Sequence, residues 1–85
     1  MEKKEDLNYF FSFSFEDYIL NYAISEDKDE VWISGEEIFQ EKTIFQTSIS
    51  FSSDEKERCF DFCRILVESR TFPRMMEELA EEFFF

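Results

Sequence analysis

Apolar and polar residues alternate along the first half of the chain with the period of two that is typical of β-strands. In residues 7–15 the odd positions are mostly aromatic and the even positions mostly polar, with Phe10 as the exception. Residues 18–24 alternate again after the acidic pair 16–17, so we expect a hairpin. Residues 25–30 contain no apolar side chain, which predicts a solvated turn after the second strand.

The next segment predicts a short strand, a break and a final strand. Residues 31–33 are apolar, and we expect that strand to end at residues 34–37, where Gly35 is available for a positive φ. Residues 38–42 fit either a loop or the beginning of the next strand. In residues 43–51 apolar and threonine positions alternate with serine and glutamine, which gives the clearest strand pattern in the chain.

The period changes to that of a helix after the last of these strands. Ser52 and Glu55 have the spacing of a capping box, and apolar residues then recur every three or four positions as far as Ser69. Pro73 is suited to the first position of a second helix. That helix carries one apolar stripe, formed by Met76, Leu79, Ala80 and Phe83.

A strand-rich half followed by a helical half predicts an α+β fold. We expect an antiparallel sheet of three to four strands, followed by two C-terminal helices packed on one face. The chain is long enough for a single domain, residues 1–85, of which residues 1–6 are expected to be disordered. Residues 18–23 are apolar on both sides of the predicted strand, which suggests a sheet covered on both faces or paired with another subunit.

The composition narrows the class of protein. The 85 residues include 21 acidic and 9 basic side chains, a net charge of −12, together with 13 Phe, 3 Tyr and 1 Trp. This aromatic content favours a folded core over disorder. The negative charge argues against direct binding to nucleic acid or to an anionic membrane, because both interactions require lysine and arginine.

The two cysteines, Cys59 and Cys63, are four positions apart in the first predicted helix. This spacing places both thiols on one face, where they pack well as small apolar groups and do not favour a disulfide. The N-terminus has no apolar stretch of the kind found in a secretory signal. We therefore expect free thiols and a cytoplasmic protein.

No set of residues in the chain indicates a reaction. The sequence contains no histidine, the commonest general base and zinc ligand. Asp27 and Asp29 match the beginning of a calcium-binding loop, but Val31 and Trp32 occupy its next ligand position and its glycine position. We expect no catalytic residue, no metal and no cofactor. A chain this short, with a filled core, also leaves little room for a pocket.

Acidic clusters are the most informative feature. Side chains two positions apart on a strand are about 6.6 Å apart, close to the spacing of successive phosphates. We therefore expect a non-enzymatic binding protein that inhibits a nucleic-acid-binding protein by occupying its basic groove. The alternative is that the acids only keep a Phe-rich protein soluble. The predicted partner-binding residues are Glu26, Asp27, Asp29, Glu30, Glu36, Glu37 and Glu41.

Two further hypotheses remain open. One is a structural or regulatory module that works by hydrophobic self-association, for example as a homodimer through Phe84, Phe85 or a strand face. The other is an immunity protein or antitoxin whose acidic surface blocks a basic nuclease.

The last third of the chain resembles a family of short, uncharacterised bacterial proteins. The matching residues are Ile49-Ser50, Ser53-Asp54, Leu66, Pro73, Glu77-Glu78-Leu79 and Glu82-Phe83. Where that family has His-Leu after the proline, this chain has Arg74-Met75-Met76, so the resemblance implies helices and no activity. In size, charge and expected architecture the chain is also similar to small acidic anti-CRISPR inhibitors of bacteriophages, which implies a phage anti-defence role by analogy of fold alone.

Overall fold

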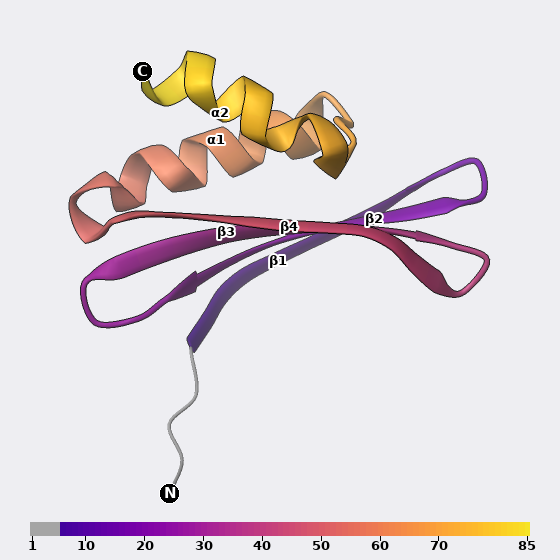
Figure 1. Ribbon diagram of the computed structural model, residues 1–85, viewed down its shortest axis with the longest axis horizontal. Helices are drawn as coiled ribbons and strands as arrows, with labels where there is room; N and C mark the ends of the chain where they lie inside the picture. Colours follow the sequence, from indigo (N-terminus) through magenta and orange to yellow (C-terminus); the bar gives the residue numbers. More distant parts are fainter. Residues whose placement is uncertain (1–5) are drawn as a thin grey trace, which may run out of the picture.

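The computed structural model describes residues 6–85 as four strands followed by two helices, which confirms the α+β class (Figure 1). The strands are β1 (Asp6–Phe15), β2 (Tyr18–Glu26), β3 (Glu30–Phe39) and β4 (Lys42–Ser52). A 3₁₀ turn, η1 (Ser53–Glu55), leads into α1 (Lys56–Glu68), and η2 (Pro73–Met75) leads into α2 (Met76–Phe84). The four strands form one antiparallel sheet in the order β1-β2-β3-β4. Of residues 1–6, expected to be disordered, 1–5 lie outside the described residues, whereas Asp6 opens β1 opposite Glu26.

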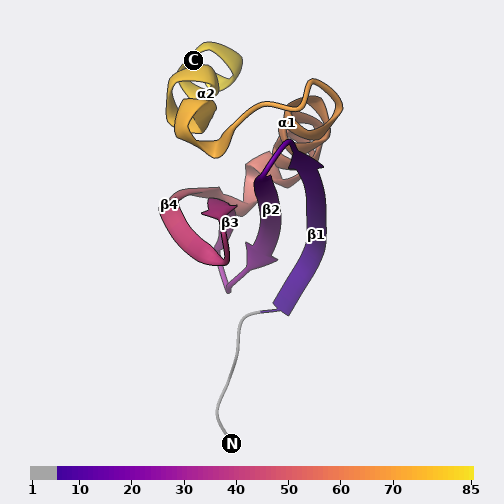
Figure 2. The same cartoon turned by 90° about the vertical axis from the view of Figure 1, so that its right-hand side faces the viewer.

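Both helices lie on one face of the sheet, as expected (Figure 1). Figure 2 shows α1 above the β1 side and α2 above the β4 side. Between them lies the core, to which the sheet contributes Tyr22, Ile24, Val31 and Ile33, and the helices contribute Cys59, Phe62, Cys63, Leu66, Met76 and Ala80. The two cysteines are buried and free, which confirms their predicted role in packing. No described helix or strand covers the opposite face of the sheet, which we call the open face.

The prediction of a short third strand is wrong. β3 continues through residues 34–37 and ends at Phe39, paired with β2 on one side and β4 on the other. The expected positive φ at Gly35 is also absent. A Cβ at this position would lie 2.9 Å from the Cβ of Pro73, so the glycine is needed because η2 packs directly on the strand.

Tight turns are made by residues other than glycine. Glu16, between β1 and β2, has a φ of 56°, and Gln40 and Glu41, between β3 and β4, have φ values of 53° and 68°. The 38–42 segment, ambiguous in sequence, is thus the end of β3, a two-residue turn and the beginning of β4. Arg70 adopts a φ of 54° just after α1. The backbone N–H of Arg70 donates to the carbonyl of Val67, and the backbone N–H of Thr71 donates to the carbonyl of Leu66. This pair of bonds is the pattern of a Schellman motif.

The first helix begins close to the predicted residue. The hydroxyl oxygen of Ser52 accepts a hydrogen bond from the N–H of Asp54 at 3.2 Å, so Ser52 is the N-cap, but through Asp54 and not through the N–H of Glu55 that a capping box uses. Glu55 pairs instead with Arg58, at 3.3 Å, and the α-helix itself begins at Lys56. Among the described residues, no helix is long and apolar enough to cross a membrane.

The three C-terminal phenylalanines have different environments. Phe83 packs against Phe62, with ring centroids 5.2 Å apart. Phe84 stacks on Phe51 of β4 at 4.2 Å, so this ring faces inward. Phe85 is 94% exposed. The prediction that Phe84 and Phe85 cannot both face inward is confirmed.

Candidate partner-binding surfaces

The turn between β2 and β3 presents four of the seven predicted acidic residues. Asp27, Asp29 and Glu30 are exposed, and Glu26 ends β2 beside them. The N-terminus of η1 adjoins this turn, because the N–H of Ser53 donates to the carbonyl of Asp29 at 3.0 Å. This contact adds two further acids, and we call the whole set the acidic end: Glu26, Asp27, Asp29, Glu30, Asp54 and Glu55.

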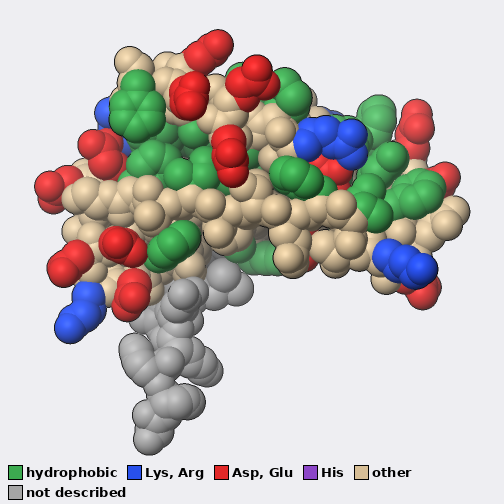
Figure 3. Space-filling model, in the orientation of Figure 1, with side chains coloured by type: hydrophobic (Ala, Val, Ile, Leu, Met, Phe, Trp, Pro, Cys, Tyr) green, Lys and Arg blue, Asp and Glu red, His purple; other side chains and the backbone are tan. Residues whose placement is uncertain are grey.

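Hydrogen bonds to the backbone shape the turn at the acidic end. The N–H of Asp27 donates to the carbonyl of Glu30 at 2.9 Å, and the Asp27 carboxylate accepts from the N–H of Lys28 at 2.8 Å. Lys56 forms an ion pair with Glu26 at 2.5 Å. Glu55 is paired with Arg58, whereas Asp29, Glu30 and Asp54 are exposed, and Figure 3 shows acidic side chains gathered at this end of the sheet. Such an arrangement produces a local negative field that attracts a basic surface.

The remaining three predicted residues do not join this cluster. Glu41 lies in the turn at the opposite end of the sheet. Glu36 lies on the open face, where its Oε2 accepts a hydrogen bond from the Nδ2 of Asn21 at 2.9 Å. Glu37, one position later, points to the helix-covered face and is fully buried. A strand alternates its side chains between two faces, so an acidic pair within it is necessarily divided.

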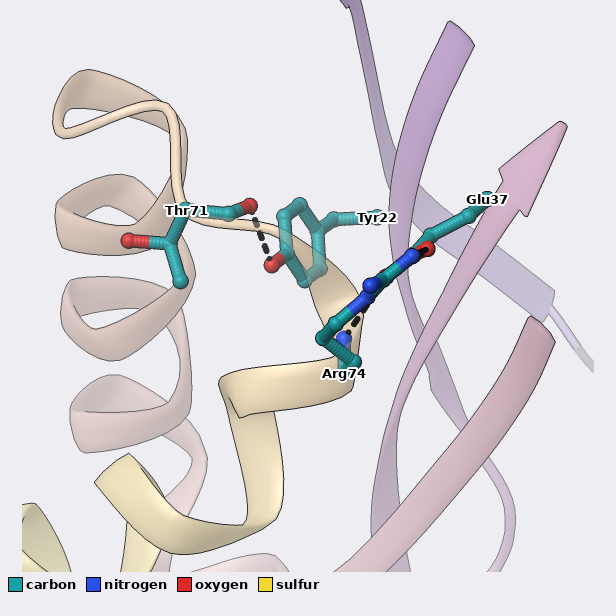
Figure 4. Close-up of polar contacts among 4 residues, drawn as sticks. All are labelled: Tyr22, Glu37, Thr71 and Arg74. Carbon is teal, nitrogen blue, oxygen red and sulfur yellow. Dashed lines mark hydrogen bonds and ion pairs between the residues drawn. The ribbon is translucent and has the colours of Figure 1, made fainter. Parts of the chain in front are cut away.

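The expectation that Glu37 lies in a solvated cluster is therefore wrong. Its carboxylate accepts hydrogen bonds from Arg74: from the backbone N–H at 2.9 Å, from Nε at 3.1 Å and from Nη2 at 2.5 Å (Figure 4). These bonds raise the pKa of Arg74. Beside them, the hydroxyl of Tyr22 donates to the carbonyl of Thr71 at 2.7 Å, and burial raises the pKa of that hydroxyl. Both contacts attach the segment between the helices to the sheet, which is a structural role.

The open face contains a hollow of about 490 Å³ that the sequence did not predict. The expectation that so short a chain leaves little room for a pocket is wrong, because the hollow lies outside the core, on the uncovered side of the sheet. The register brings polar side chains of three neighbouring strands together at its floor. We call it the open-face hollow, lined among others by Phe10, Asn21, Ser34, Glu36, Gln46 and Ser48.

One buried polar atom in this hollow has no partner. Asn21 is only 9% exposed, and although its Nδ2 is bonded to Glu36, its Oδ1 is buried without a hydrogen bond. An unsatisfied buried acceptor costs about 1–3 kcal/mol. The only signal in the sequence was a single asparagine among the otherwise apolar residues 18–24. Its significance depended on Glu36, which comes from the segment predicted to break the third strand.

Among residues 6–85, no three acidic or cysteine side chains converge closely enough to hold a metal ion. The two cysteines lie in the core, where burial raises the pKa of Cys59 to about 11 and that of Cys63 to about 12. Thiols with a raised pKa are protonated at neutral pH and are poor nucleophiles.

No family model, curated protein or solved structure matches this chain. The two resemblances inferred from sequence therefore supply no function.

Proposed function

We propose that this protein is a non-enzymatic acidic binding protein that inhibits a nucleic-acid-handling protein by occupying its basic groove. The observation that carries the proposal is the acidic end, where six carboxylates from β2, the β2–β3 turn, β3 and η1 lie beside three basic side chains, Lys28, Lys56 and Arg58. A groove that binds nucleic acid is lined by lysine and arginine and gains affinity by releasing counterions. A fixed array of carboxylates competes for the same groove through the same charges.

The hydrogen-bonded backbone of this end supports the proposal. Its backbone is held by the bonds of Asp27 and Ser53, so its charges are positioned before a partner arrives. Pre-organised charge reduces the entropy lost on binding and speeds association through electrostatic steering. A phage anti-defence protein, an immunity protein and an antitoxin would all use this surface in the same way, and the identity of the partner distinguishes them.

The test compares two variants of equal charge. The first neutralises the acidic end with Glu26→Gln, Asp27→Asn, Asp29→Asn and Glu30→Gln. The control neutralises four exposed helix residues, with Glu68→Gln, Glu78→Gln, Glu81→Gln and Glu82→Gln. Both sets remove four negative charges, so a difference between them reports the location of the charges and not their sum.

Proteins captured from the host lysate are then titrated with wild type and both variants, in competition with duplex DNA and with RNA. We expect the first variant to bind at least about tenfold more weakly and the control to stay within about twofold, with affinity falling as salt rises from about 50 to 500 mM. Equal affinity for all three proteins, or a partner that binds nucleic acid and this protein together, would contradict the proposal.

Self-association is the second candidate, and exposed apolar side chains favour it. Phe85 is 94% exposed, and on the open face Phe10 is 56% exposed. Two copies of a chain with a charge of −12 repel one another, so salt strengthens such a dimer. Sedimentation at low and high salt separates this candidate from the first, whose partner binding weakens with salt.

A further inference from the structure

The open-face hollow is concave and lined by polar side chains of neighbouring strands, whereas the acidic end is an exposed turn. Its polar groups are fixed by the sheet, because Asn21, Glu36 and Gln46 occupy directly paired positions of β2, β3 and β4. Its volume, about 490 Å³, lies within the range of sites that accept a small ligand or one large side chain.

The chemistry of these groups selects a ligand that donates hydrogen bonds. Asn21 donates one N–H of Nδ2 to Glu36 and leaves Oδ1 as an unsatisfied acceptor. Glu36 carries a negative charge and accepts that bond through Oε2, so a ligand meets its second oxygen, Oε1. Two acceptors with one charge between them favour a cation with several N–H groups.

We propose that the open-face hollow binds the guanidinium group of an arginine side chain from the partner protein. Guanidinium is planar, always charged, and carries N–H donors in a fixed fork that can bond Glu36 Oε1 and Asn21 Oδ1 together. Phe10, exposed at the margin of the hollow, offers a ring on which a guanidinium stacks. Oδ1 is buried, so the guanidinium reaches it after the Asn21 amide rotates about its terminal torsion, which is soft.

Lysine fits this site less well. Its ammonium is a compact, strongly hydrated charge that loses more on leaving water and does not stack in the same way. The inference rests on the proposed function in one respect, since it takes the partner to be a basic protein. It adds that one arginine of that protein is bound at the centre of the open face, away from the acidic end.

The site is tested without any partner, by following the amide signals of the labelled protein in NMR titrations. The probe is Nα-acetyl-arginine methylamide, and its controls are the corresponding lysine and citrulline derivatives. Citrulline has nearly the shape of arginine without its charge. We expect the arginine probe to shift the signals of Ser34, Gln46 and the Asn21 side chain with a saturable millimolar isotherm, and both controls to bind at least about fivefold more weakly.

Two variants test whether the arginine probe binds in the open-face hollow. Glu36→Gln removes the charge and is expected to weaken the arginine probe about tenfold in the hollow, whereas Glu30→Gln at the acidic end leaves that isotherm within about twofold. Asn21→Ala should also weaken binding, and Glu36→Gln decides the question if that variant does not fold.

Hollow signals that do not move, that respond equally to lysine and citrulline, or that behave alike in wild type and Glu36→Gln would overturn the inference. These outcomes are independent of the charge-location experiment above. The acidic end can fail as a partner surface while the hollow binds arginine, and the reverse also holds.

Discussion

Glu37 and Arg74 are 37 positions apart in the chain, yet Arg74 holds the buried carboxylate of Glu37 with both its backbone N–H and its guanidinium (Figure 4). The two partners differ in exposure, since the Glu37 side chain is 0% exposed and that of Arg74 is 52% exposed. Removing the arginine therefore leaves a buried negative charge, whereas removing the glutamate leaves a cation in water.

We expect Arg74→Met to destabilise the protein strongly, because Glu37 then keeps only one backbone donor in an apolar site. The matched control is Arg64→Met, which breaks the exposed pair with Asp61 at 2.8 Å. That pair is worth about 0.5 kcal/mol or less. The loss of unfolding free energy relative to wild type, measured by urea titration, should be several-fold larger for Arg74→Met than for Arg64→Met. Similar values would show that the Glu37 contact is not important for folding.

Gly35→Ala is expected to cost about 1–3 kcal/mol through overpacking. The new methyl group would lie 2.9 Å from the Cβ of Pro73 and 3.2 Å from Cε1 of Tyr22, neither of which is the end of a flexible side chain. Ser50→Ala, on the exposed side of β4, is the control and should change stability by less than about 0.5 kcal/mol. A neutral Gly35→Ala would mean that η2 does not pack on β3 as described.

Phe84→Ala and Phe85→Ala should have different effects although the residues are adjacent. Phe84 stacks on Phe51 at 4.2 Å and meets Phe62 edge-on at 5.4 Å, so its loss is expected to cost about 2–3 kcal/mol. Phe85 is 94% exposed, and its loss should change stability by less than about 0.5 kcal/mol. Thermal unfolding of both variants measures the difference. Equal losses of stability would show that Phe84 does not pack against Phe51 and Phe62 as described.

Stability should fall in alkaline solution because the thiols are buried. In the folded protein the pKa of Cys59 is about 11 and that of Cys63 about 12, whereas a thiol in an unfolded chain ionises near pH 8.5. The unfolded state therefore loses its protons first, and stability present below about pH 8.5 is lost progressively as the pH rises through the folded values.

Urea titrations between about pH 8 and 11 measure this slope. The double variant Cys59→Ala, Cys63→Ala should show a shallower decline, although its stability at neutral pH is lower because of the cavity. Tyr22 contributes in the same direction in both proteins, because burial raises the pKa of its hydroxyl too. An identical slope in both proteins would exclude the thiols as its source.

The sequence predicted the elements whose pattern is local. Strands β1, β2 and β4 and both helices follow from periodicity, and the beginning of α1 follows from the side chain of Ser52. The extent of β3 was missed because serine, glycine and glutamate are poor strand formers. In the structure they are kept in the sheet by neighbours on both sides and by the contact of Gly35 with Pro73.

The candidate binding surfaces also divide into features that could be predicted from local sequence and features that could not. The acidic residues of the β2–β3 turn could be read directly from four neighbouring positions. The burial of Glu37 could not, because the counter-charge is supplied by Arg74 from a distant segment. The open-face hollow could not be predicted from the sequence either, because it depends on the register that places Asn21 opposite Glu36 and Glu36 opposite Gln46.

The chain has one glycine, and it lies in the middle of β3. The left-handed positions at Glu16, Gln40, Glu41 and Arg70 are therefore held by residues for which that conformation costs about 1 kcal/mol each. These turns therefore lower the stability of the fold, and contacts elsewhere in the sheet and at the helix junction compensate for that cost. The guanidinium of Arg70 also lies 5.5 Å from the ring centroid of Phe13, a contact that glycine would remove. At Glu16, Gln40 or Glu41, glycine would raise stability without touching the core, the acidic end or the open-face hollow, so the two tight hairpin turns are where this small protein can be made more stable.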